Sequence, residues 1–167
     1  MKNKLAVIGI LLAMVSVSCN TQTYLPDHEE LDVSYFGSFI KIRNTTGSII
    51  TGELIAVDSN GVIVLTNTDG SRQAVTVQKE EIEKYKVIYA KAKNYAWTIP
   101  LYAALTASHG MWLIFTAPVN LLVTTAITAS AITQFQYNRR EMAYGNLYMF
   151  ARFPQGLPPN IDILSLK

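Results

Sequence analysis

A long uncharged segment constrains this chain more than any other feature. Residues 94–138 form a run of 45 residues that contains no Lys, Arg, Asp or Glu. Pro118 lies near its middle and disfavours helical geometry at the residue before it, which predicts a turn at residues 116–120. We therefore expect an apolar helical hairpin with arms at residues 98–115 and 119–135. Each arm would be about 25–27 Å long, slightly short of the roughly 30 Å of a bilayer core.

Small side chains recur at four-residue spacing in both arms. Ala103 and Ala107 are such a pair in the first arm, with Gly110 following, and Ala126 and Ser130 are one in the second. This spacing puts small side chains on one face of a helix, so that two backbones can approach closely. The two arms are therefore predicted to pack through these residues.

Aromatic residues mark the open end of the predicted hairpin. Tyr95 and Trp97 precede the first arm, and Phe135 and Tyr137 close the second, as in the aromatic belt of a membrane interface. Trp112 is a further candidate contact. The pattern predicts docking onto lipid or onto a membrane-protein partner. The alternative is a water-soluble hairpin that is buried by its neighbours or by a partner.

The N-terminus reads as an export signal. Lys2 and Lys4 form a positive region, and residues 5–17 are an apolar run that ends just before the single cysteine, Cys19. A basic start followed by a short apolar run is typical of a secretory signal peptide. With one cysteine in the chain, no intramolecular disulfide is possible.

Ser16-Val17-Ser18-Cys19 resembles the end of a bacterial lipoprotein signal, with Ser16 where the usual motif has Leu. The resemblance implies that residues 1–18 are removed and that Cys19 carries acyl chains such as palmitate. Asn20 follows Cys19 in place of the Asp that retains some lipoproteins in the inner membrane. The expected location is the cell envelope, at the outer membrane facing the periplasm.

The charge balance argues against a nucleic-acid partner. The chain has 14 basic and 12 acidic residues, and loss of residues 1–18 removes Lys2 and Lys4, leaving equal numbers. A neutral protein lacks the positive surface charge that nucleic-acid binding requires. No cofactor and no metal site are predicted either, because His28 and His109 have no ligand or nucleophile motif around them.

Residues 34–89 alternate between short apolar strands and turns. The predicted strands are residues 39–43, 48–57, 62–66, 73–77 and 83–89, with a helical turn at residues 79–82. Gly52 lies inside the second strand, where a missing side chain allows a bend or a bulge. Five strands of this kind predict a small barrel of the SH3-like type.

The same region resembles the first signature segment of the Sm-like family. The matching residues are Ile40-x-Ile42, Gly47, Gly52-x-Leu54, Asp58 and the Val62/Val64 pair. The resemblance implies the fold of that family. Its RNA binding is not carried over, because Arg72 is followed by Gln73 where the family has Arg-Gly, and because Asp58 and Asn60 have a different spacing.

The fold class predicted for the whole chain is α+β. The expected parts are a signal peptide (1–18), a tether (19–33), a five-stranded SH3-like barrel (34–93), the hydrophobic hairpin (94–138) and an extended C-terminal segment (139–167). This last segment, rich in proline near residue 154, is expected either to cover the barrel or to dock a partner. Strands are expected at residues 147–153 and 161–166.

The function favoured by these features is that of a non-enzymatic envelope lipoprotein with a structural or accessory role. It would be held by acylated Cys19 and by the hairpin, which would contact lipid or an integral envelope complex. One alternative is a subunit of an oligomeric membrane channel or transport assembly, with hairpin threonines lining a pore. Another is a small hydrolase that uses His109.

Overall fold

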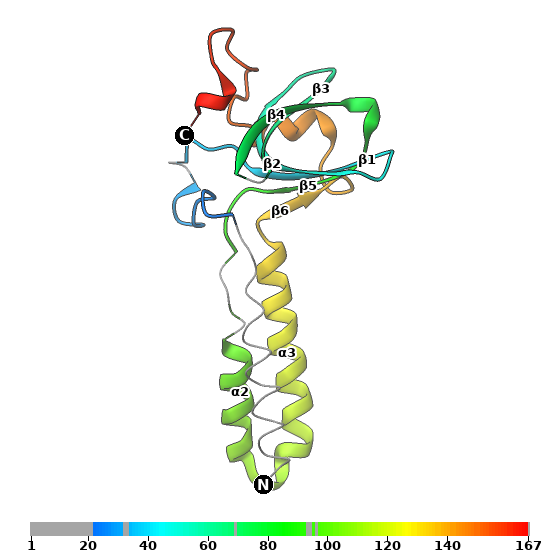
Figure 1. Ribbon diagram of the computed structural model, residues 1–167. Helices are drawn as coiled ribbons and strands as arrows, with labels where there is room; N and C mark the ends of the chain where they lie inside the picture. Colours follow the sequence, from blue (N-terminus) through cyan, green and yellow to red (C-terminus); the bar gives the residue numbers. More distant parts are fainter. Residues whose placement is uncertain (1–21, 32–33, 69, 93–94, 96, 167) are drawn as a thin grey trace. The chain divides into compact units, whose positions relative to one another are not determined.

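A computed structural model describes residues 22–31, 34–68, 70–92, 95 and 97–166. They form an α+β fold (Figure 1). Contacts divide the chain into a helical unit around Ala92–Gln134 and a sheet unit made of Gln22–Lys91 and Phe135–Lys167. The predicted signal, residues 1–18, and Cys19 lie outside the described residues.

The sheet unit is built on six strands: β1 (Phe39–Asn44), β2 (Ile49–Val57), β3 (Gly61–Thr68), β4 (Ser71–Gln78), β5 (Ile82–Ile88) and β6 (Gln136–Asn138). The spatial order is β4-β3-β2-β1-β5-β6, with every neighbouring pair antiparallel. The five predicted strands are thus present, and a 3-10 turn, η2 (Lys79–Glu81), precedes β5 as expected. The short sixth strand comes from the end of the uncharged segment.

The closed five-stranded barrel is not confirmed. The sheet is open, and β6 lies on the outer side of β5. β5 nevertheless pairs back onto β1, which joins the last strand of the meander to the first.

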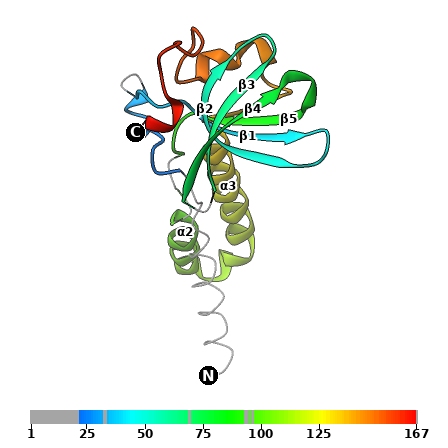
Figure 2. The same cartoon turned by 45° about the horizontal axis from the view of Figure 1, so that its top comes forward.

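Alternation along the strands sets the core of the sheet. In β1, Ile40 and Ile42 are fully buried, whereas Lys41 and Arg43 are exposed. Successive side chains of a strand point to opposite faces, so one face of β1 enters the core and the other meets solvent. Leu147 completes the same core from η4 (Tyr144–Phe150), which lies against the sheet in Figure 2.

Gly52 is required by close packing of two strands. A Cβ atom at this position would lie 2.2 Å from the carbonyl oxygen of Leu65 on β3. A bend or bulge was expected at Gly52. The structure has the irregularity of β2 slightly further along the strand, between Leu54 and Ala56, where the register to β3 shifts by one residue. The glycine therefore permits strand contact, and the bulge follows it.

The C-terminal segment covers part of the sheet, but the two strands predicted in it were wrong. Residues 144–150 form η4, and residues 163–165 form a second 3-10 turn, η5 (Ile163–Ser165). Phe153 and Leu157 pack against a second buried cluster that includes Ile55 of β2. Short apolar runs in a proline-rich segment can bury side chains without pairing as strands, and periodicity alone does not separate the two cases.

The described part of the predicted tether, residues 22–31, is packed onto the sheet unit. Leu25 is 2% exposed. The backbone N–H of Lys91 donates to the carbonyl of Pro26 at 2.9 Å, and the Lys91 ammonium lies 3.9 Å from the Asp27 carboxylate. These residues therefore belong to the folded unit and are no free linker.

The helical unit consists of α2 (Thr98–Thr106), the 3-10 segment η3 (Ala107–Trp112) and α3 (Leu113–Thr133). The turn predicted at Pro118 was wrong, because the chain reverses in η3, where Gly110 has a φ of 59°. Glycine adopts such positive φ angles without a steric cost. Pro118 is the sixth residue of α3, so its missing N–H removes one hydrogen bond just beyond the first turn.

Candidate functional site

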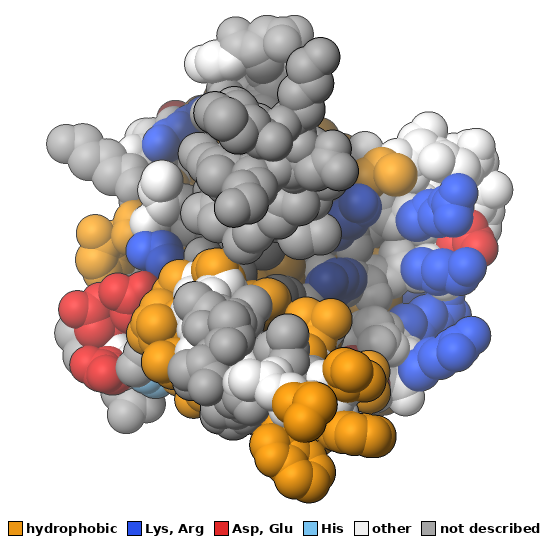
Figure 3. Space-filling view, turned by 90° about the horizontal axis from the view of Figure 1, so that it is seen from below, with side chains coloured by type: hydrophobic (Ala, Val, Ile, Leu, Met, Phe, Trp, Pro, Cys, Tyr) orange, Lys and Arg blue, Asp and Glu red, His pale blue; other side chains and the backbone are white. Residues whose placement is uncertain are grey.

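The helical unit exposes an unusual amount of large apolar surface. Around the turn, Met111 is 89% exposed, Trp112 71% and Ile114 74%. Figure 3 shows hydrophobic side chains gathered on this part of the surface. A contiguous exposed apolar surface of this kind marks a site of contact with lipid or with another protein.

The exposed apolar side chains are concentrated toward the turn. Among the described side chains of α3, seven large apolar ones are exposed: Ile114, Phe115, Val119, Leu121, Leu122, Val123 and Ile127. Six of the seven lie in the first half of the helix. The second half, residues 124–133, consists mainly of Ala, Thr and Ser. The surface is therefore most apolar at the closed end of the hairpin and becomes more polar toward its open end.

A polar seam joins the two helices on their facing sides. The Asn120 side-chain amide donates to Thr106 Oγ1 at 2.9 Å, and the Thr106 hydroxyl in turn donates to the carbonyl of Tyr102 at 2.6 Å. Thr124 and Thr128 donate to the carbonyls four residues earlier, at 2.7 and 2.9 Å. Each of these polar groups therefore has a hydrogen-bond partner within the hairpin.

A small cavity of about 150 Å³ lies beside this seam, between α2 and α3. Thr106 is 3% exposed and Thr128 8%, so the seam is shielded from solvent. Its residues in α3 recur every four positions, at 120, 124 and 128. That repeat is visible in the sequence and is the signal that could have identified the helix contact.

The structure describes only some of the residues predicted to pack the hairpin. Ala126 and Ser130 are exposed, away from the seam. Gly110 forms the turn. Ala103 belongs to α2 and Ala107 to η3, but their side chains are not among those that the structure describes. The seam uses hydrogen-bonding residues where small-residue spacing was expected.

One helical window among the described residues is long and apolar enough to cross a bilayer, by length and composition. It is Ile114–Ala131, with a mean hydropathy of 1.5 and 11% of the window buried. Helices that form the core of a water-soluble protein also pass this test, but they are mostly buried. α2 has nine residues, or about 13.5 Å, and is too short to cross a bilayer of about 30 Å.

The predicted aromatic belt is divided between the two units. In the helical unit, Trp97 is 61% exposed just before α2, and the carbonyl of Tyr95 accepts the Thr98 N–H and hydroxyl. In the sheet unit, the rings of Phe135 and Tyr137 pack against Tyr89, with centroids 5.8 and 5.6 Å apart. Phe135 and Tyr137 thus have aromatic partners within the sheet unit.

Of the two histidines, the structure describes the side chain of His28. The imidazole Nε2 of His28 is 3.6 Å from the Glu29 carboxylate. Within the described part of the chain, no three His, Cys, Asp or Glu residues are grouped so as to hold a metal ion. The side chain of His109, in η3, is not among those described.

The sheet unit contains one buried ion pair. Arg152 Nη1 lies 3.4 Å from Glu53 Oε1, which also accepts the Gly37 N–H at 2.8 Å, and both side chains are about nine-tenths buried. The guanidinium lies over the ring of Phe36, 5.2 Å from its centroid. Burial raises the pKa of Glu53, an effect that the Gly37 hydrogen bond and the Arg152 charge oppose. The pair connects β2 to the C-terminal segment and is a structural element of the sheet unit.

Comparison with known proteins finds no similarity to draw on, since no family model, no curated protein and no solved structure matches the chain.

Proposed function

We propose that this protein is a non-enzymatic, membrane-attached envelope lipoprotein whose hairpin inserts into one leaflet of a bilayer. The observation that carries the proposal is the gathering of exposed apolar side chains at the closed end of the hairpin, from Met111 to Val123. The role would be structural or accessory, with membrane lipid as the direct contact. An integral envelope complex is the alternative recipient of the same surface.

The dimensions of the hairpin favour insertion into one leaflet. α2, at about 13.5 Å, matches the half-thickness of a hydrocarbon core, which is about 15 Å. Exposed Trp97 would then lie at the interface, where Trp is enriched, and the turn would lie near the bilayer centre. The more polar second half of α3 would leave the hydrocarbon. The 3-10 hydrogen bonds of η3 reduce the cost of placing a turn in lipid.

A second attachment comes from the proposed acylation of Cys19. One acyl chain by itself gives marginal, reversible binding, whereas two membrane signals together give stable attachment. With the N-terminal lipid and the hairpin acting together, the chain would stay on the envelope membrane, and we propose the periplasmic face of the outer membrane. The channel alternative has less support, because Thr124 lines the cavity between α2 and α3, and both Thr124 and Thr128 donate to carbonyls of their own helix.

The test removes the lipid and leaves the hairpin. Cys19→Ala, exported through a cleavable non-lipoprotein signal, is compared with the parent chain by washing membranes with alkaline carbonate. Retention of the Cys19→Ala protein is expected, because the hairpin itself would hold lipid. Its release, with the parent retained, would overturn insertion of the hairpin. Incorporation of labelled palmitate into the parent and its loss in the variant is the expected result for acylation.

For the sheet unit we propose an SH3-like ancestry of the Sm-like type. Support comes from the order of β1 to β5, from pairing of β5 onto β1, and from the 3-10 turn η2 before β5. The open edge and the added β6 distinguish this sheet from a closed barrel. Small barrels host many functions, so the fold type carries no activity with it.

A further inference from the structure

The exposed face of β1 and β5 carries four cations in register. Lys41 of β1 lies opposite Lys86 of β5, and Arg43 lies opposite Lys84. Residues two apart in a strand share a face, so all four belong to one side of the sheet. Figure 3 shows several Lys and Arg side chains side by side on this part of the surface.

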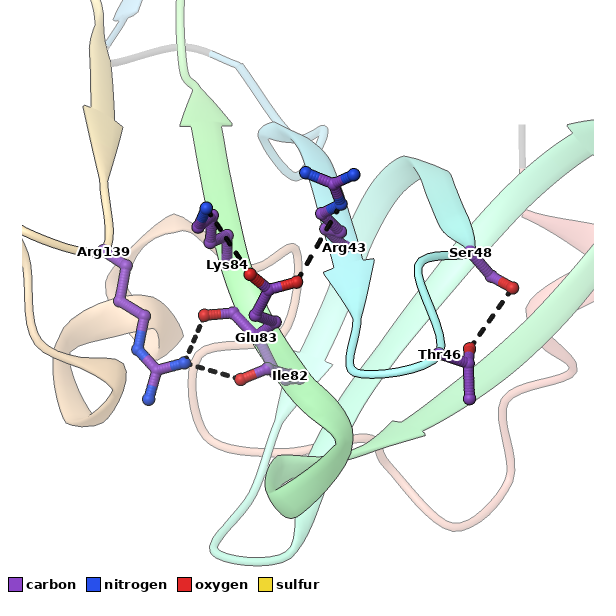
Figure 4. Close-up of polar contacts among 7 residues, drawn as sticks. All are labelled: Arg43, Thr46, Ser48, Ile82, Glu83, Lys84 and Arg139. Carbon is purple, nitrogen blue, oxygen red and sulfur yellow. Dashed lines mark hydrogen bonds and ion pairs between the residues drawn. The ribbon is translucent and has the colours of Figure 1, made fainter.

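Like charges in directly opposed positions destabilise a strand pair. The sheet compensates for only part of this charge. Glu83 lies 3.9 Å from the Arg43 guanidinium and 3.4 Å from the Lys84 ammonium (Figure 4). Among the residues that the structure describes, Lys41 and Lys86 form no ion pair within 4 Å. An arrangement that costs stability and is left partly uncompensated indicates that an external anion completes it.

Two further cations extend the charge onto the edge of the sheet. Arg139 and Arg140 directly follow β6, the edge strand paired with β5. The Arg139 guanidinium is held by the carbonyls of Ile82 and Glu83, which fixes its position on this face (Figure 4). These cations line an open surface hollow of about 900 Å³, together with Lys41, Arg43, Ile49, Glu83, Lys84, Tyr85, Lys86 and Asn138.

We propose that this basic face binds the phosphate groups of an anionic phospholipid membrane. Six cations face a single acid, Glu83, which gives charge complementarity to a negatively charged surface. The cations are spread over neighbouring strands about 4.8 Å apart and along them at about 7 Å, which suits an array of phosphates better than one isolated ion. Ile49, 56% exposed beside them, and the lysine stems suit the boundary between head groups and acyl chains.

The sequence adds a second reason for a membrane partner. β5 carries two of these cations and is the last strand before the hairpin, and Arg139 and Arg140 follow the first strand after it. The inference thus rests on the proposed membrane attachment and deepens it, because it adds a preference for anionic lipid. Each Lys or Arg near an anionic surface contributes about a fivefold gain in affinity.

The experiment uses the Cys19→Ala chain and flotation on phosphatidylcholine vesicles, with and without phosphatidylglycerol. Lys41→Gln/Lys86→Gln is compared with a matched control, Arg72→Gln/Lys79→Gln, which removes the same charge away from this face. Arg72, exposed on β4, donates to the carbonyl of Leu166, and Lys79 lies 5.2 Å from the centroid of the Tyr144 ring. We expect the first pair to lose roughly 25-fold in affinity for the anionic vesicles, about fivefold for each lysine. The control pair should keep the parent affinity.

The outcomes separate this inference from the proposed function. Binding of all chains to neutral vesicles, with no gain from phosphatidylglycerol, would overturn the anionic preference alone, whereas absence of any flotation would overturn membrane insertion. Equal losses of affinity in both variant pairs would show that only the net charge of the protein matters, and would overturn the proposal that the basic face is the binding site. Strong binding of soluble polyphosphate that blocks the gain would assign the site to a soluble anion instead. The gain itself should vanish near 1 M salt, where charges are screened within about 3 Å.

Discussion

A lysine scan of α3 gives the most direct test of the proposed insertion of the hairpin into a membrane. The decisive substitution is Ile114→Lys, at a side chain that is 74% exposed beside the turn. In water, a charged residue at such an exposed position changes stability by about 0.5 kcal/mol or less. Near the centre of a bilayer the same residue is strongly unfavourable.

The magnitude follows from the exposed surface of α3. Each large apolar side chain near the centre of a membrane helix contributes about −0.3 to −0.6 kcal/mol, so the six in the first half of α3 supply about −2 to −4 kcal/mol. Lysine costs about 2.5–3.5 kcal/mol at the centre. Ile114→Lys should therefore remove most of the driving force and lower vesicle partitioning roughly 100-fold or more.

The assay is flotation of the Cys19→Ala chain on neutral vesicles, with Leu122→Lys and Thr133→Lys in parallel. Insertion into one leaflet predicts the largest loss at Ile114, a smaller loss at Leu122 and little loss at Thr133, where lysine reaches the head groups. A helix that crosses the bilayer instead predicts the largest loss at Leu122.

A flat profile would refute the insertion proposal. If all three lysine variants float like the parent, the hairpin surface contacts no hydrocarbon, and an integral partner becomes the occupant to seek. Circular dichroism of each variant in detergent controls for loss of helix.

Three further predictions concern the folded units. Arg152→Met should lower the free energy of unfolding by about 3 kcal/mol at neutral pH, because it leaves a buried carboxylate without its cation. The loss should shrink as the pH falls through the pKa of Glu53, which burial already raises, since the protonated acid needs no cation. Gly52→Ala should destabilise the sheet by about 2–3 kcal/mol or more, because the added Cβ meets a carbonyl of β3. Asn120→Leu should weaken the hairpin by about 1 kcal/mol by removing the bond between the helices.

Each of these has its own check. Denaturant unfolding at several pH values would contradict the ion-pair reasoning if the Arg152→Met loss were the same at pH 4 and pH 7. Gly145→Ala is the matched glycine control, since nothing lies within 4 Å of a Cβ there, and equal effects of both glycine changes would refute the steric account. For Asn120, a double-mutant cycle with Thr106→Val in detergent should give a coupling energy, and additive losses would argue against the seam.

The strands were predictable because local alternation reports burial directly. Ile40 and Ile42 alternate with two charged residues of β1. The structure buries both isoleucines and exposes both charged residues. The open edge was not predictable, because closure depends on pairing between distant residues. β6 lies at the end of the uncharged segment, and its three residues are too few to show an alternating pattern of their own.

In the hairpin, composition identified the helical unit but misplaced its turn. The turn was predicted at Pro118, but a proline near the start of a helix removes only one hydrogen bond and does not end the helix. The reversal of the chain needs a residue that tolerates a positive φ angle, and Gly110 is that residue. The polar seam was not expected from the sequence, because a threonine that donates to its own helix can be buried like an apolar residue. Thr128 is the example, at 8% exposure.

The pairing of β5 with β6 gives the chain a modular design. Ile88 lies opposite Gln136, so the 47 residues between them occupy the place of an ordinary turn between antiparallel strands. Replacing a two-residue turn by a loop of this length costs the sheet about 3 kcal/mol of closure entropy at most, since that cost grows only with the logarithm of length. The hairpin can therefore lengthen, shorten or change composition while the sheet keeps its register. Excision of residues 92–134 and closure with a short glycine-containing turn should leave a folded sheet unit.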